Sequence, residues 1–286
     1  MNSAVRYRPL LALAGVLGVL VVAPAPASAQ KPPNPCLDAL QRATLRCPDL
    51  KMRKPFGLRV DPFVHPGRVM LRAGNSIDSL GAGPAELFGV RSARMYMKAR
   101  QRIYRRARGQ RVGVATGARL YFKYIPRQRS YWKFLHAAQF DLYRQNADGT
   151  RGRRVRRGPK VSYCLRDLEH TTPGRARSPR KRVYPACNTS SRTRKVRLGT
   201  SVGWSDVYPP AYPEQYIDVT GLRGCFSYVH TADPRNGIYE SNERNNASTV
   251  VVRLPFRGGR QRCPGPQAAA IPDTRDYDAE YSDVYR

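Results

Sequence analysis

The chain has 286 residues, of which 51 are Lys or Arg and 20 are Asp or Glu, so its formal net charge is +31. The six cysteines form no C-x-x-C pair, which argues against zinc ribbons and thioredoxin-type redox sites. The P-loop and HExxH motifs are absent, which argues against P-loop nucleotide hydrolases and zinc metalloproteases.

The first residues have the features of a secretory signal peptide. Arg6 and Arg8 form a basic region, residues 10–22 are apolar, and residues 27–29 are small residues suited to cleavage. The apolar run is shorter than the roughly 20 residues that a membrane-spanning helix needs. We therefore expect residues 1–29 to be removed and the mature chain to be secreted, extracellular or attached to the cell wall, without a transmembrane segment. An uncleaved N-terminal anchor is the alternative.

The cysteines of the mature chain predict disulfide bonds. All six follow the expected signal peptide, and an even number in an exported chain favours pairing. Cys164 and Cys187 flank a long basic segment and make a good pair. Cys225 and Cys263 are suited to joining the last strand to the one before it.

Residues 30–46 are expected to form an N-terminal segment that is rich in proline at its start and has a short helix at residues 38–45. In one straight helix, Cys36 and Cys47 would lie about 16 Å apart. A disulfide requires Cα atoms within about 7 Å. Either this segment bends, or these two cysteines pair with others.

Residues 47–256 are expected to form an all-β domain, an antiparallel β-sandwich with long disulfide-stapled loops. Short apolar and β-branched segments alternate with Pro, Gly and Asn turn signals at intervals of about 8–12 residues, as in β-sandwiches. The clearest of these segments are residues 85–90, 120–125, 140–143, 216–219, 225–229 and 249–254.

Two Arg-rich stretches allow alternatives. Residues 91–111 fit either a basic amphipathic helix or a strand, and we favour the strand because Met95, Met97 and Ile103 fit a helical period poorly. Residues 151–160 follow a hairpin turn signal and fit either a return strand with a charged edge or a solvated loop.

The remaining residues, 257–286, are expected to form a flexible tail rich in acidic residues and tyrosine. Its last part, residues 267–286, has five acidic residues against two Arg, so its charge is opposite to that of the basic loop at residues 172–197. We therefore hypothesise that the tail folds onto that loop.

Three blocks of the sequence point to one family. They are GPKVSYCLRD at residues 158–167, GWSDVY at 203–208 continuing to QYIDVTG at 215–221, and ESNERNN at 240–246. In this order, within a secreted β-rich chain, they resemble the bacterial secreted branch of the lysyl oxidase family. The resemblance covers roughly residues 47–256.

The resemblance implies an oxidase that converts peptidyl lysine or a small amine to an aldehyde. The family uses copper and lysine tyrosylquinone, a cofactor made by joining a Lys to an oxidised Tyr, whose electrophilic carbonyl takes up the amine. The resemblance assigns the Lys and Tyr precursors of this cofactor to Lys160 and Tyr208. It gives no role to the nearby Asp206. From the residue pattern alone, Lys160 is one more charge in a basic hairpin and Tyr208 is an ordinary core tyrosine.

The copper ligands that the resemblance leads us to expect are nearly absent. The family has a histidine-rich run at the position of residues 129–136, which here reads RSYWKFLH, so Tyr131 and Lys133 replace two histidines and His136 remains. Cu(II) favours several imidazoles, and a protonated Lys133 would repel the ion. The four histidines are scattered along the chain: His65, His136, His170 and His230.

The same run has a second interpretation, as a strand with Trp132 and Phe134 on a buried face and Lys133 in solvent. Three functions are therefore left open, and whether the chain is an enzyme depends on which is right. The first is a secreted lysyl-oxidase-family protein with weakened or lost activity that binds anionic polymers of the cell wall or matrix, or nucleic acid, through its charge. The second is an active copper and quinone protein-lysine 6-oxidase. The third is a polyanion-binding module without a cofactor.

Overall fold

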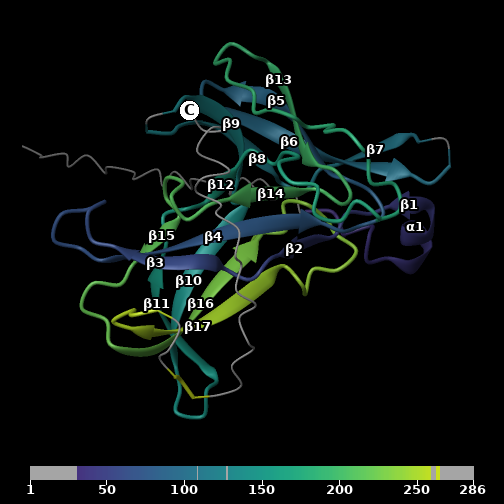
Figure 1. Ribbon diagram of the computed structural model, residues 1–286. Helices are drawn as coiled ribbons and strands as arrows, with labels where there is room; N and C mark the ends of the chain where they lie inside the picture. Colours follow the sequence, from purple (N-terminus) through teal and green to yellow (C-terminus); the bar gives the residue numbers. More distant parts are fainter. Residues whose placement is uncertain (1–30, 108, 127, 259–261, 265–286) are drawn as a thin grey trace, which may run out of the picture. The chain divides into compact units, whose positions relative to one another are not determined.

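The fold is described here from a computed structural model, which covers residues 31–107, 109–126, 128–258 and 262–264 (Figure 1). Apart from one short helix, the regular structure of these residues is β, and the paired strands are antiparallel. The expected all-β, antiparallel fold is therefore confirmed. The expected signal peptide and nearly all of the expected acidic tail lie outside the described residues, and the domain boundaries stay predictions. Among the residues described, none of the helical structure has the length and apolarity required to cross a bilayer.

The largest sheet has eight strands, ordered β12-β9-β8-β6-β5-β13, with β1 and β7 also paired to β6. Its strands are β1 (Leu45–Arg46), β5 (Ala85–Ala93), β6 (Tyr96–Arg105), β7 (Arg111–Val114), β8 (Arg119–Tyr124), β9 (Ser130–Leu135), β12 (Ser162–Tyr163) and β13 (Lys195–Thr200). The strand expected within residues 91–111 is thus confirmed as β6, and its alternating buried and exposed residues explain why Arg and apolar residues alternate in the sequence.

Two further sheets complete the fold. One is ordered β11-β10-β16-β17, and in the other β4 pairs with β2, β3, β14 and β15. Their strands are β2 (Leu50–Met52), β3 (Phe56–Asp61), β4 (Met70–Ser79), β10 (Ala138–Gln145), β11 (Arg151–Arg157), β14 (Ser205–Tyr208), β15 (Tyr216–Asp218), β16 (Gly224–Ala232) and β17 (Ala247–Leu254). The Arg-rich return strand β11 lies at the edge of its sheet, where charged side chains oppose pairing with other chains.

One hydrophobic core joins the three sheets. It contains Trp132 from the eight-stranded sheet, Phe140 and Tyr228 from the second sheet, and Ile77 from the third, all of them fully or almost fully buried. Burial of each such large side chain stabilises the fold by about 1.5–3 kcal/mol. The sheets are therefore held together by packing as well as by the covalent links of the disulfides.

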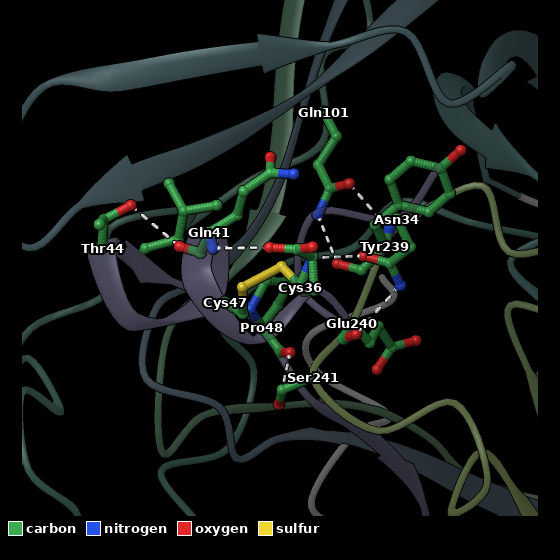
Figure 2. The surroundings of a disulfide bond; sticks show 12 residues. Asn34, Cys36, Gln41, Thr44, Cys47, Pro48, Gln101, Tyr239, Glu240 and Ser241 are labelled. Carbon is green, nitrogen blue, oxygen red and sulfur yellow. Dashed lines mark hydrogen bonds between the residues drawn. A yellow bond between two sulfur atoms is a disulfide. The ribbon is translucent and has the colours of Figure 1, made fainter. Parts of the chain in front are cut away.

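The helix α1 (Ala39–Thr44) explains how the first disulfide forms (Figure 2). The side chain of Asp38 caps its first turn by accepting a hydrogen bond from the amide of Gln41 at 2.8 Å. The helix is only six residues long, so the segment bends and brings the Cα atoms of Cys36 and Cys47 to 5.7 Å. Of the two alternatives for Cys36 and Cys47, a bent segment is therefore correct, and the two cysteines pair with each other.

The other two disulfides are Cys164–Cys187 and Cys225–Cys263, as expected. The first of them holds the long basic segment after residue 171 against the eight-stranded sheet, where the amide of Trp132 donates a hydrogen bond to the carbonyl of Asn188 at 3.0 Å. The segment has little regular structure before β13, so its position depends on this bond and on such contacts.

Candidate functional site

Strand β14 carries two of the residues singled out in the sequence, Asp206 and Tyr208. It pairs with β4, so that Asp206 lies opposite Ile77 and Tyr208 opposite Asn75, and all four of its residues are buried. A strand that is buried on both faces holds its side chains in a fixed arrangement, because no solvent lies beside them. Tyr208 therefore projects into the protein interior rather than toward solvent.

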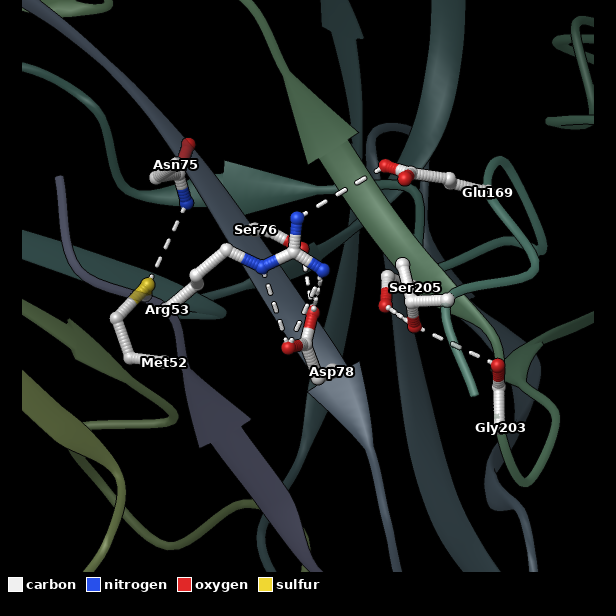
Figure 3. Close-up of polar contacts among 9 residues, drawn as sticks. Met52, Arg53, Asn75, Ser76, Asp78, Glu169, Gly203 and Ser205 are labelled. Atoms are coloured by element: carbon white, nitrogen blue, oxygen red, sulfur yellow. Dashed lines mark hydrogen bonds and ion pairs between the residues drawn. The ribbon is translucent and has the colours of Figure 1, made fainter. Parts of the chain in front are cut away.

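A polar network beside β4 anchors β14 (Figure 3). The guanidinium of Arg53 contacts the carboxylate of Asp78 at 3.2 Å and that of Glu169 at 3.9 Å. Glu169 in turn forms a β-bridge with Ser205, the first residue of β14. This network fixes the start of β14 and thereby the position of Tyr208 at its end.

Lys160 reaches the same place from the segment that joins β11 to β12. The amide of Gly158 donates a hydrogen bond to the carbonyl of Phe140 at 2.8 Å, and a Cβ atom at Gly158 would lie 2.8 Å from the carbonyl oxygen of Tyr216. Only glycine allows this close approach. This close approach of the two backbone segments directs Lys160 into the interior, where its Nζ lies 4.5 Å from the centroid of the Tyr208 ring. The structure thus brings together the two residues that the sequence resemblance paired.

Aromatic rings enclose the amine of Lys160. Nζ lies 4.1 Å from the Tyr212 ring centroid and 4.9 Å from that of Tyr163, while Tyr163 and Tyr208 stack at 4.4 Å. Nζ has no hydrogen-bond partner among the described residues. Burial, and then the charge of Lys133, lower the pKa of Lys160 well below its ordinary value. The amine is therefore biased toward its neutral, nucleophilic form.

Lys133 is a second buried amine at this site, and the expectation that it is solvated is wrong. It is 1% exposed, and its Nζ donates a hydrogen bond to Tyr212 Oη at 3.3 Å. Trp132 and Phe134 are buried as expected, but the face of β9 that carries Lys133 meets Tyr208 and Tyr212 instead of water. Burial lowers the pKa of Lys133 to about 8, partly opposed by the charge of Asp206.

Asp206 is the carboxyl group that faces these amines. Burial raises its pKa to about 7, against the opposing effects of the positive charges of Arg166, Lys133 and Lys160. Near neutral pH the site therefore holds a carboxyl group and amines that all titrate far from their ordinary ranges. Such clustering is typical of functional sites, although buried ion pairs produce it too.

A small cavity of about 40 Å³ opens beside Tyr208. It is lined by Gln128, Tyr131, Lys133, Arg166, Cys187, Tyr208 and Tyr212. The Cys164–Cys187 bond supplies part of one wall, so the basic segment helps to close the site. No role could be inferred from the sequence for Gln128, Tyr163, Arg166 or Tyr212, because only the fold brings these residues together from three separate segments.

The four histidines lie in four different environments. His65 contacts Tyr216 Oη at 2.8 Å, His170 stacks on Trp204 at 4.4 Å, and His230 stacks on Phe140 at 3.8 Å in the core. His136 has a positive φ of 64° and lines a separate cavity of about 130 Å³ together with Asp233 and Arg235. No histidine lines the cavity beside Tyr208.

The residues around Tyr208 do not fit a copper ion. The cavity offers an amide, phenols, an amine and a guanidinium, whereas Cu(II) is held in proteins mainly by imidazole and thiolate groups. Tyr131 and Lys133 line it where two imidazoles were expected, and Lys133 and Arg166 contribute positive charge there. Within the described part of the chain, no three His, Cys, Asp or Glu side chains are grouped so as to hold a metal.

The model of the family described as lysyl oxidase matches residues 93–261, more than half of the chain. No curated protein sequence gives a significant match. The matched region includes β6 to β17 and therefore Lys133, Lys160, Asp206 and Tyr208.

Proposed function

The chain belongs to the lysyl oxidase family, and we propose that it is an exported member whose copper-dependent amine oxidation is weakened or lost. The observation that carries this proposal is the position of Lys133. Its amine is buried between the rings of Tyr208 and Tyr212, at a sequence position where the family has an imidazole.

The loss of copper ligands affects the cofactor as well as the metal. In this family the oxidation of the tyrosine precursor depends on copper, and the residues around Tyr208 offer no imidazole for it. We therefore expect Tyr208 to remain a phenol, stacked on Tyr163 at 4.4 Å. A phenol has no electrophilic carbonyl that could take up a substrate amine.

Export and a surface role agree with the composition of the chain. The three disulfides are typical of proteins that fold in an oxidising compartment. The edge strand β11 presents exposed arginines beside the turn at its start, namely Arg151, Arg153, Arg154, Arg156 and Arg157. We propose that this strand contributes to the binding of anionic polymers of the cell wall or matrix, or of nucleic acid, through counterion release.

The experiment is metal analysis of the mature chain, purified after export by its native host. We expect copper well below one equivalent and no quinone absorption or redox staining. The matched gain-of-function variant is Tyr131→His/Lys133→His, which restores two imidazoles on one face of β9 and should bind Cu(II) at least tenfold more tightly. Stoichiometric copper in the wild-type chain, with a quinone signal that Tyr208→Phe abolishes, would overturn the proposal.

The second candidate function is an active oxidase of peptidyl lysine or small amines, and the Lys160–Tyr208 geometry favours it. Nζ of Lys160 lies 4.5 Å from the Tyr208 ring centroid, and its lowered pKa suits an amine that must attack an oxidised ring. This function predicts a mass loss that reports a Lys160–Tyr208 cross-link, and peroxide release with an alkylamine. Both signals should be absent in Lys160→Arg and retained in Tyr163→Phe, which alters the neighbouring tyrosine only.

A further inference from the structure

We propose that the cavity beside Tyr208 is a covalent binding site for a small aldehyde that carries a carboxylate, with Lys133 as the amine that takes up the carbonyl group and Arg166 as the partner of the carboxylate. The proposal needs neither copper nor a quinone, so it goes beyond the function proposed above. It rests on which side chains line the cavity and on the size of the cavity.

The cavity determines the size of the ligand. Its volume is about 40 Å³. By this measure a single water molecule needs about 10–15 Å³. The space therefore accepts a molecule of a few heavy atoms, such as glyoxylate, and excludes a peptidyl lysine side chain in an extended conformation.

The charge of the walls selects an anion. Lys133 and the half-buried Arg166 both line the cavity, whereas no carboxylate is among its lining residues. Asp206 interacts electrostatically with both cations, but it is fully buried and does not line the cavity, and burial favours its neutral form. A planar guanidinium suits a carboxylate because it can donate two parallel hydrogen bonds.

Lys133 is the amine that can react. It lines the cavity, whereas Lys160 is not among the lining residues and is enclosed by three tyrosine rings. Charged groups act on Lys133 from several elements: Asp206 of β14, Lys123 of β8, Glu214, and Arg166. A desolvated amine beside other cations is the environment in which proteins make lysine nucleophilic at neutral pH.

The reaction is a condensation that requires no oxidant. The neutral amine of Lys133 adds to the carbonyl carbon, which forms the C–N bond, and a proton from nitrogen passes to the carbonyl oxygen. Tyr212 Oη, hydrogen-bonded to Nζ at 3.3 Å, is placed to relay that proton. The resulting carbinolamine loses its hydroxyl group together with the second amine proton as water, and the product is an imine between Lys133 and the aldehyde carbon.

The test is reductive trapping on the full mature chain after treatment with a chelator. The chain is incubated with glyoxylate and cyanoborohydride, and the modified lysines are located by peptide mass spectrometry. We expect the label at Lys133 to approach one per chain at a glyoxylate concentration that labels the exposed Lys98 and Lys195 at least tenfold less. Labelling of Lys133 no faster than that of Lys98 would overturn the proposal.

Acetaldehyde, which lacks the carboxylate, tests the role of Arg166. In the wild-type chain, the preference for Lys133 over Lys98 should be at least tenfold greater with glyoxylate than with acetaldehyde, a comparison that requires no variant. Arg166→Gln should remove this difference and leave acetaldehyde labelling within twofold, with its thermal midpoint measured to verify folding. Equal preference for Lys133 with the two aldehydes in the wild-type chain would overturn the assignment of the carboxylate to Arg166.

Discussion

Nζ of Lys160 lies 4.5 Å from the centroid of the Tyr208 ring, although the two residues belong to segments far apart in the sequence. The contact depends on two separate structural features. Gly158 permits the close approach that turns Lys160 inward, and the β4–β14 pairing fixes Tyr208. The pair therefore persists as a feature of the fold whether or not a cofactor is ever formed from it.

The buried amine of Lys160 should destabilise the fold. It has no hydrogen-bond partner among the described residues, and a buried polar group without one costs about 1–3 kcal/mol. We expect Lys160→Met, which keeps the length of the side chain, to raise the free energy of unfolding by about that amount at pH 7, measured by urea denaturation. The control is Lys133→Met, which also removes a hydrogen bond to Tyr212, so its free energy of unfolding should rise by less than that of Lys160→Met. An equal change of unfolding free energy in the two variants would contradict the prediction.

Lys133 should make stability depend on alkaline pH. Its pKa is about 8 in the folded chain, whereas a lysine in an unfolded chain titrates near 10.4. Between these values the unfolded state binds a proton that the folded state does not, so stability rises with pH by about 1.4 kcal/mol per unit. The stability difference between the wild-type chain and Lys133→Met should therefore grow in favour of the wild type from pH 8 to pH 10. A difference that stays constant would refute this.

These two lysines also show what could be predicted from the sequence and what could not. The alternation Trp132-Lys133-Phe134 correctly indicated a strand with both aromatic residues on a buried face. It could not show what covers the opposite face, because Tyr208 and Tyr212 come from a distant segment. A lysine on that face was therefore expected in solvent, as most lysines are.

Local signals in the sequence predicted local structure well, whereas contacts between residues far apart in the sequence were harder to predict. The expected short helix is present, and the bend that joins Cys36 to Cys47 follows from the shortness of that helix. The proximity of Lys160 and Tyr208 was anticipated only from a family resemblance. The cavity residues Gln128, Arg166 and Tyr212 were not anticipated, because residue spacing says nothing about contacts made across three sheets.

His230 should weaken the fold in acid. It is fully buried, stacks on Phe140 at 3.8 Å, and burial lowers its pKa to about 3. An unfolded histidine titrates near 6.5, so between these values the unfolded state takes up a proton and stability falls as pH falls, by about 1.4 kcal/mol per unit.

The variant His230→Phe tests this, because it keeps an aromatic ring against Phe140 and cannot be protonated. Its unfolding free energy should fall less steeply than that of the wild-type chain between pH 6 and pH 4. Asp206 and Asp233, whose pKa values are raised to about 7, stabilise the fold as pH falls, but they are present in both chains and cancel in the comparison. If the unfolding free energies of the two chains fall equally steeply between pH 6 and pH 4, then protonation of His230 on unfolding does not contribute to the loss of stability in acid.

Arginines of the edge strand β11 should contribute more to polyanion binding than other exposed arginines. Arg154 and Arg157 contact Asp141 at 3.9 and 2.8 Å, while Arg153 and Arg156 are also exposed on the same strand. Each arginine that contacts a phosphate of single-stranded nucleic acid contributes about 0.7 to the slope of log affinity against log salt concentration. We therefore expect the double variant Arg153→Gln/Arg156→Gln to reduce the slope for an oligonucleotide by about 1.4.

The matched control is Arg94→Gln/Arg105→Gln, which removes the same charge from exposed positions in or beside the eight-stranded sheet. Fluorescence anisotropy across a series of salt concentrations measures both slopes. A smaller reduction in the control locates the contact at β11, because only arginines that neutralise phosphates release counterions. Equal reductions would mean that the chain attracts polyanions through its total charge, with no part of the surface specialised for it.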